Sequence, residues 1–155
     1  MSFHKPRWLA VFFAFLCVFA PLRENTSLMT ENEVAKHIVD VAFKIHSGYG
    51  PGLLESVYEA IMAYELEKRG LIATRQQPIP LVHEQLRMGV GFRADLIVAG
   101  KVIVEIKSIE AIGPVHKKQL LTYLRLADKR LGLLINFNVE LIKNGISRVV
   151  NGLQE

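Results

Sequence analysis

The sequence predicts an α/β fold in which a mixed β-sheet is covered by helices. Three observations support this class. Apolar residues recur with helical spacing from about residue 30 to residue 69, short β-prone runs separated by turn residues fill the middle of the chain, and a helical segment followed by a buried-type strand comes last. The chain has 155 residues, of which half are apolar and 22% are charged, so it is long enough for one globular domain with a substantial core.

The first 28 residues differ from the rest. Residues 8–20 form an unbroken apolar run of thirteen residues with basic residues before it, which is too short to span a bilayer comfortably. The run fits a secretory signal peptide and fits equally an extension upstream of a functional start at Met29; a retained membrane anchor is a third reading. We expect the domain itself, residues 29–155, to be cytoplasmic and without stable membrane insertion.

Composition excludes several classes of protein. Cys17 is the only cysteine, which excludes an internal disulfide framework and a cysteine-rich zinc site. The chain contains no Gly-rich nucleotide-binding motif and no nucleophile elbow. Residues 1–28 account for half of the formal net charge of +4, so the charge of the whole chain argues only weakly for an anionic partner.

Two amphipathic helices are expected first. Residues 30–33 (TENE) form a capping box, in which the Thr hydroxyl and the Glu carboxylate satisfy amides that the helix start leaves free. From Val34 to Ile45, apolar residues recur at steps of four, three and four, and residues 47–52 (SGYGPG) end this helix. A second helix runs from about Leu53 to Arg69, with Gly70 suited to its C-terminal cap.

A meander of antiparallel strands is expected next, because four short β-prone runs follow one another. These runs are residues 79–82, 86–90, 94–98 and 102–106. Gly113 and Pro114 then open a helix, and Leu131 to Phe137 returns as a buried-type strand. The predicted order of elements is α-α-β-β-β-α-β, with a weak final strand near residues 146–150.

The hairpin formed by the third and fourth runs carries charges inside apolar strands. If its loop is the three residues 99–101, Asp95 lies directly opposite Glu105, with Cβ atoms roughly 5 Å apart, and Lys107 projects from the same face. A loop of two residues would instead place the two carboxylates on opposite faces of the sheet, because strand side chains alternate. The interpretation therefore depends on an odd loop.

Two carboxylates this close favour a cation between them. A hard divalent ion such as Mg²⁺, or Mn²⁺, accepts carboxylate oxygens and keeps water positions open for a phosphate and a nucleophile. Lys107 would orient or activate the attacking water and stabilise the charge that builds on phosphorus. Arg93 would face Lys107 in this register, which makes sense if a phosphate lies between them. The spacing alone fits a solvated strand face with an ordinary ion pair equally well.

Together with residues 52–58 (GLLESVY), this spacing resembles the bacterial GxxExxY proteins, a branch of the PD-(D/E)xK nuclease superfamily. The resemblance covers about Met29 to the end of the chain. It includes the approach at residues 48–52, the Asp95 strand, Glu105-Ile106-Lys107, and Gln119 with Tyr123. Ala94 stands where the superfamily pattern has Pro.

The resemblance implies a restriction-endonuclease-like core and assigns roles to single residues. Asp95 and Glu105 would bind the metal, and Lys107 would assist catalysis. Glu55 would be a further metal ligand and would also count among the catalytic residues. Gln119 and Tyr123 would complete the catalytic centre from a following helix, and they share one face of it because they are four residues apart. These last three side chains also have ordinary explanations. A carboxylate in a first helical turn is favoured by free amides alone, and isolated Gln and Tyr residues usually lie at a surface or its boundary.

Lys117 and Lys118 follow His116 at the start of the helix that carries Gln119. Free amides and basic side chains there could receive a backbone phosphate, although a solvated basic turn is the commoner meaning of such a cluster.

The leading hypothesis is therefore a Mg²⁺-dependent phosphodiesterase that acts on nucleic acid, with DNA favoured over RNA. A domain of this size needs further duplex contacts, so we expect a homodimer or a partner subunit. The second hypothesis is a non-catalytic module that keeps the nuclease fold and binds nucleic acid or protein.

Overall fold

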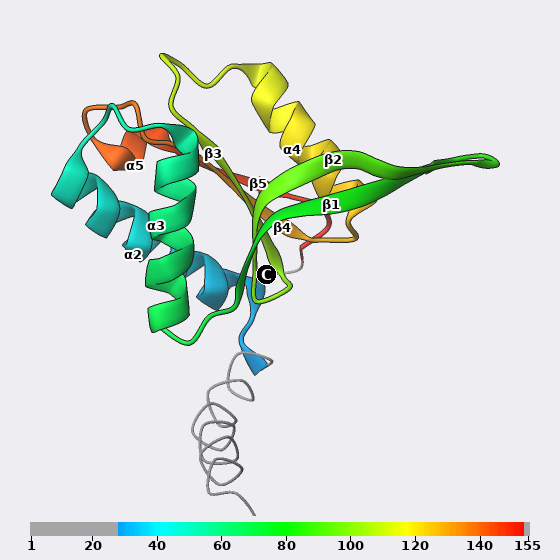
Figure 1. Cartoon of the computed structure of the whole chain (residues 1–155), viewed down its shortest axis with the longest axis horizontal. Helices are drawn as coiled ribbons and strands as arrows, with labels where there is room; N and C mark the ends of the chain where they lie inside the picture. Colours follow the sequence, from blue (N-terminus) through cyan, green and yellow to red (C-terminus); the bar gives the residue numbers. More distant parts are fainter. Residues whose placement is uncertain (1–27, 154–155) are drawn as a thin grey trace, which may run out of the picture.

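The computed structural model describes residues 28–153 and contains a mixed sheet of five strands with helices on both faces (Figure 1). The strands are β1 (Ala73–His83), β2 (Leu86–Val98), β3 (Val102–Lys107), β4 (Leu131–Asn136) and β5 (Ile146–Val150). They lie in chain order across the sheet. Strands β3 and β4 are parallel, and every other neighbouring pair is antiparallel. The predicted fold class is confirmed.

The helices divide the apolar residues into two cores. They are α2 (Glu31–Tyr49), α3 (Glu55–Lys68), α4 (Pro114–Leu126) and the short α5 (Ile142–Gly145). Helices α2 and α3 pack on one face of the sheet and bury the larger core, whereas α4 covers the other face and buries the smaller one. Helix α4 lies very close to β4, since a Cβ atom at Gly132 would come within 3.0 Å of the Leu120 side chain.

Several predicted helix boundaries hold. Thr30 and Glu33 form the expected capping box at the start of α2, with Glu33 N donating to Thr30 Oγ1 over 3.2 Å and Thr30 N donating to Glu33 Oε2 over 2.7 Å. Helix α2 continues through Tyr49 and so ends within residues 47–52, as predicted. It ends at Gly50, whose φ of +67° is a conformation that favours glycine.

The four predicted β-prone runs form three strands. The runs at residues 86–90 and 94–98 are one continuous strand, β2, and β1 begins at Ala73, six residues before its predicted start at Ile79. The two prolines of β1 obscured its beginning, but β1 is an edge strand, where a missing N–H is tolerated. The weak final strand is present as β5, and the short helix α5 before it was not predicted.

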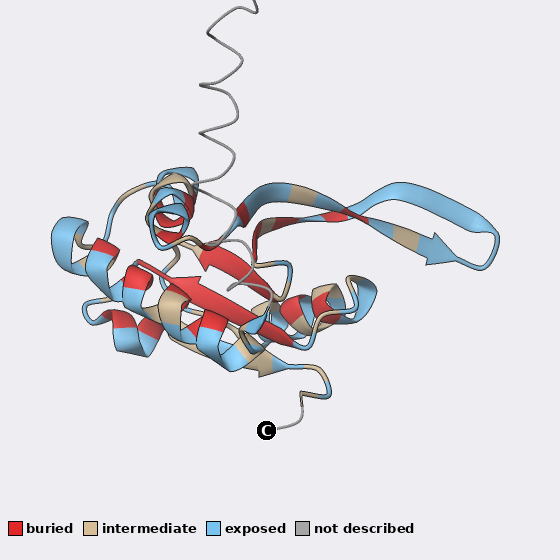
Figure 2. Cartoon of the chain, turned by 90° about the horizontal axis from the view of Figure 1, so that it is seen from below, coloured by how far each residue is buried: buried red, intermediate tan, exposed pale blue. Residues whose placement is uncertain are grey.

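Strands β1 and β2 extend beyond the sheet as a long hairpin, here called the β-arm (residues 77–93), which projects away from the helices (Figures 1 and 2). Most of its outer part is exposed, including four large apolar side chains. These are Val82, Leu86, Met88 and Val90.

Within residues 28–153, no helix is long and apolar enough to cross a membrane. The interpretations of the apolar run at residues 8–20 concern a segment outside the described residues.

Candidate functional site

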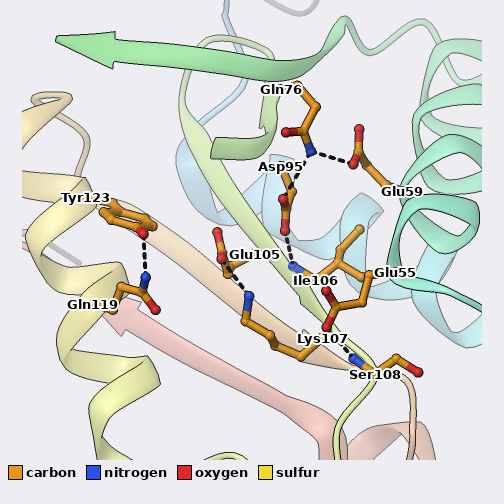
Figure 3. A network of polar contacts seen from close by, with 10 residues as sticks. All are labelled: Glu55, Glu59, Gln76, Asp95, Glu105, Ile106, Lys107, Ser108, Gln119 and Tyr123. Atoms are coloured by element: carbon orange, nitrogen blue, oxygen red, sulfur yellow. Dashed lines mark hydrogen bonds and ion pairs between the residues drawn. The ribbon is translucent and has the colours of Figure 1, made fainter. Parts of the chain in front are cut away.

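The candidate site lies where β2 and β3 separate (Figure 3). Their ladder runs from Val98↔Val102 to Leu96↔Val104 and is not continued beyond that pair, while β3 remains paired with β4 as far as Lys107. The connecting loop has the three residues that the prediction required. Its first two, Ala99 and Gly100, have φ values of +52° and +66°, which close the tight turn. The register is therefore confirmed, and Asp95 and Glu105 lie on facing strands immediately past the last pair.

Asp95 has a hydrogen-bond donor on each carboxylate oxygen. Ile106 N donates to Oδ2 over 2.9 Å, and Gln76 Nε2 donates to Oδ1 over 3.2 Å. The Ile106 amide is free to do so because β2 has left the ladder at this point. Burial raises the pKa of Asp95 above its ordinary value, although the bond from Ile106 opposes this change.

Glu105 is the most enclosed of the predicted site residues, with a relative exposure of 7%. Its Oε1 accepts a hydrogen bond from Lys107 Nζ over 2.8 Å, whereas its Oε2 is buried and has no hydrogen-bond partner among the described residues. Burial raises the pKa of Glu105, and the charge of Asp95 raises it further. For Lys107, burial alone lowers the pKa, but the bond to Glu105 and the neighbouring carboxylates outweigh it and raise the pKa overall. The lysine is thus held as a cation.

Glu55 joins the site from the first position of α3. Its Oε1 accepts a hydrogen bond from Ser108 N over 2.9 Å, directly after Lys107 in the chain (Figure 3). The Ser108 hydroxyl in turn donates to Leu53 O over 3.1 Å. These two bonds fasten the start of α3 to the end of β3. The charge of Glu55 also contributes to the raised pKa of Glu105.

Tyr58 explains why this helix start has a fixed position. The Tyr58 hydroxyl donates to Gly50 O over 2.7 Å and accepts from Leu53 N over 3.2 Å, so it ties the glycine-containing loop to the helix. The ring is fully buried and stacks on Phe137 with centroids 4.1 Å apart. Tyr58 is thus a core aromatic residue whose hydroxyl reaches the edge of the core.

Gln119 and Tyr123 reach the same region from α4 (Figure 3). Gln119 Nε2 donates to the Tyr123 hydroxyl, and the Tyr123 ring stacks on Phe92 of β2 with centroids 3.7 Å apart. Burial raises the pKa of Tyr123, and the charge of Glu105 adds to this effect. The phenol is therefore within electrostatic reach of the carboxylates.

The predicted phosphate-binding residues lie outside this network. Arg93 pairs with Pro78 across the β-arm, and its Nη1 donates to Gln76 O over 3.4 Å. The expectation that Arg93 faces Lys107 was wrong, because β2 has already left β3 at Asp95. Lys117 and Lys118 are exposed in the first turns of α4.

Two polar residues that the sequence analysis did not single out belong to the network. Glu59 of α3 is only 4% exposed and accepts hydrogen bonds from Arg75 Nε over 2.8 Å and from Gln76 Nε2 over 2.7 Å. Gln76 is the same side chain that donates to Asp95. Glu59 lies one helical turn after Glu55, and this spacing was the one signal in the sequence that could have revealed it.

A sequence model of the PD-(D/E)XK nuclease superfamily matches residues 32–149, a range that contains every residue of this network. The chain belongs to the PD-(D/E)XK nuclease superfamily. Among solved structures, an alkaline exonuclease (LHK-Exo) from Laribacter hongkongensis is similar at 14% identity and a TM-score of 0.44, covering 84% of this chain and 76% of that one. The structure titled SSO0001 is similar at 16% identity and a TM-score of 0.43, covering 90% and 78%. No curated protein matches the chain.

PD-(D/E)XK nucleases generally use divalent metal ions, and the donors of this site fit such an ion. Glu105 Oε2 is a buried oxygen without a hydrogen-bond partner in the described part of the chain, and it comes from the strand facing Asp95. Carboxylate oxygens are the ligands that hard divalent cations prefer. Between residues 28 and 153, no three His, Cys, Asp or Glu side chains form a ready-made metal site. Asp95 and Glu105 thus offer two carboxylates from the sheet, and further oxygens from other side chains, water or substrate would complete the coordination.

Proposed function

We propose that residues 29–155 form a metal-dependent nuclease of the GxxExxY branch that hydrolyses phosphodiester bonds of nucleic acid, with DNA favoured over RNA. The observation that carries the proposal is the buried Oε2 of Glu105, which has no hydrogen-bond partner within residues 28–153 and lies beside Asp95 in a chain of the PD-(D/E)XK nuclease superfamily. An oxygen buried in this way is costly unless a cation or a donor reaches it. We assign that cation as Mg²⁺ or Mn²⁺.

In this proposal Asp95 and Glu105 hold the metal, and Glu55 adds a third carboxylate at the end of β3. A bound divalent ion supplies positive charge to the phosphate and acidifies a water molecule. Two hydrogen bonds hold Asp95 and leave further lone pairs on both of its oxygens. Glu105 can use Oε2 for the metal while Oε1 keeps its bond to Lys107.

Lys107 is the residue best placed to act on the substrate. Because its Nζ is a cation anchored by Glu105, its remaining hydrogens can orient the attacking water and stabilise the negative charge that develops on the phosphoryl oxygens. Gln119 and Tyr123 form a hydrogen-bonded pair on the α4 side and would position the scissile phosphate.

We assign the flanking phosphates of the substrate to three basic residues around the site. Arg93 lies at the base of the β-arm, and Lys117 and Lys118 lie at the start of α4. Their exposure suits contacts with a backbone that approaches from solvent. Mass spectrometry of the native N-terminus would distinguish a cleaved signal peptide from a functional start at Met29.

The test is titration of Mg²⁺ and Mn²⁺ into the purified protein by calorimetry, together with cleavage assays on plasmid DNA and on RNA in the same buffers. Asp95→Ala removes one proposed ligand, and Asp128→Ala makes the same change at an exposed turn after α4. We expect saturable metal binding and cleavage for the wild type and for Asp128→Ala, and neither for Asp95→Ala. A wild type that shows neither at millimolar metal contradicts the nuclease proposal.

The β-arm favours a second candidate function, a non-catalytic binding module that keeps the nuclease fold. A two-stranded hairpin is only marginally stable by itself, yet the β-arm exposes four large apolar side chains. A second copy of the chain or a partner subunit would cover such a surface. Binding of nucleic acid or protein that survives Lys107→Ala, without any cleavage by the wild type, would support this candidate.

A further inference from the structure

A chain of hydrogen bonds connects helix α3 to Asp95 through Gln76. Gln76 Nε2 lies 2.7 Å from Glu59 Oε2 and 3.2 Å from Asp95 Oδ1, so a single amide nitrogen contacts both carboxylates (Figure 3). A primary amide nitrogen carries two hydrogens, and each can serve one carboxylate. The opposite orientation of the amide would direct its oxygen at two carboxylates, which is repulsive. The chemistry therefore fixes which end of the amide faces the site.

The backbone of Gln76 is shaped to make this contact. Its φ is +48°, in the left-handed region that residues with a side chain rarely adopt. The β1–β2 ladder has pairs on both sides, Arg75↔Leu96 and Gln77↔Ala94, but none at Gln76, so the chain leaves the regular ladder there without a change of register. Arg93 Nη1 donates to the Gln76 carbonyl oxygen over 3.4 Å. A conformation of this kind persists when surrounding contacts demand it, and it is typical of functional sites.

Glu59 is an unusual residue to find beneath a sheet. Its carboxylate is buried at 4% exposure, although charged groups are almost never buried unless they are paired. Its two oxygens are used by Arg75 and by Gln76. The bond from Gln76 orients the amide that holds Asp95.

We propose that Glu59 and Gln76 are positioning residues that hold the Asp95 carboxylate in its metal-binding orientation. The inference rests on the proposed function, because it gives these two residues a role in the same metal site. Glu59 fixes the Gln76 amide, Gln76 fixes Oδ1 of Asp95, and Ile106 N fixes Oδ2. Since Glu55 lies on the same helix as Glu59, one rigid element sets the positions of two acidic groups of the site.

The test measures metal affinity and cleavage rate for variants of the full chain. Gln76→Gly removes the amide while glycine accepts the positive φ without strain. Gln85→Gly makes the same change at the exposed tip of the β-arm and serves as the matched control. Outer partners of metal ligands typically contribute about 10- to 100-fold to metal affinity or activity. We expect Gln76→Gly to weaken Mg²⁺ or Mn²⁺ binding by at least about 10-fold relative to Gln85→Gly.

A double-mutant cycle separates positioning from a merely structural role. Glu59→Gln should weaken metal binding less than Gln76→Gly, and adding it to Gln76→Gly should change the affinity no further, because Glu59 acts through the amide. Glu67→Gln makes the same change at an exposed position of the same helix and is the control for Glu59→Gln. If the wild type binds metal and Gln76→Gly binds it equally well, the positioning role is overturned and the nuclease proposal stands. If the wild type neither binds metal nor cleaves, both proposals are overturned.

Discussion

Replacing Glu105 by glutamine should stabilise the metal-free protein and abolish its response to metal. This carboxylate is 7% exposed and lies beside a second carboxylate, and its Oε2 has no hydrogen-bond partner in the described part of the chain. Glutamine keeps an oxygen for Lys107 and replaces the unpartnered oxygen by a donor that can serve Asp95. The raised pKa of Glu105 indicates that the neutral glutamine should be more stable in this position than the charged carboxylate. Burial and the Asp95 charge disfavour the charged form of Glu105 more than Lys107 favours it.

The size of the effect follows from the cost of an unsatisfied buried group, about 1–3 kcal/mol. The weakened bond to Lys107 offsets part of this, which leaves a gain of about 1 kcal/mol, or about 2–4 °C in melting temperature for a chain of this length. The gain should depend on pH. A carboxyl group whose folded pKa is raised contributes stability that is fully present below its unfolded pKa and is lost as the pH rises through the folded value. The advantage of Glu105→Gln should thus be present at pH 7.5 and disappear near pH 4.

The assay is thermal unfolding with EDTA and with saturating Mg²⁺, at both pH values. Metal at 100 times its Kd would stabilise the wild type by about 2.7 kcal/mol, so the order of the two melting temperatures should reverse when metal is added. Glu140→Gln provides the same substitution at an exposed position. A Glu105→Gln protein that melts below Glu140→Gln in EDTA at pH 7.5 would refute the reasoning.

Three further substitutions have definite expectations. Lys107→Met should reduce the cleavage rate by about 100-fold or more while metal affinity in calorimetry changes little, because the lysine stabilises charge on the substrate and binds no metal; loss of metal binding would contradict this. Tyr58→Phe removes both hydrogen bonds of the Tyr58 hydroxyl to the loop at Gly50, so it should lower the free energy of unfolding in urea by about 1 kcal/mol and reduce cleavage. Unchanged stability would show that these two bonds do not hold the loop. Gly132→Ala should lower the free energy of unfolding by about 1–3 kcal/mol in the same assay, since its Cβ would crowd Leu120. An unaltered unfolding midpoint would show that α4 can shift away from β4 without loss of stability.

The centre of the site could be predicted from the sequence because it depends on local spacing. The odd loop before β3 sets the register, and the register brings Asp95 and Glu105 together. The prediction that Arg93 faces Lys107 failed because it extended the same register past the point where β2 leaves β3. A sequence pattern carries the alternation of side chains along a ladder, but it does not show where the ladder stops.

The outer part of the site could not be predicted, because it depends on contacts between distant elements. Glu59 and Gln76 meet across the packing of α3 on β1, and the polar residues around Gln76, with Pro78 after them, concealed that β1 had already begun. The positive φ of Gln76 likewise leaves no trace in the composition of the strand. Residues of this kind become visible only when the helix is placed on the sheet.

The separation of β2 from β3 is what makes a metal site possible in an otherwise regular sheet. A continued ladder would pair the Ile106 amide with a backbone carbonyl, whereas here that amide holds Asp95. The Glu55 carboxylate of α3 joins Asp95 and Glu105 there, and the charges of all three raise the pKa of Lys107 (Figure 3). The site therefore carries an excess of negative charge although the whole chain is basic, with a formal net charge of +4. A phosphodiester would be repelled from such a site. Under the proposed function we therefore expect a cation to bind there before the substrate, and metal affinity should not require nucleic acid.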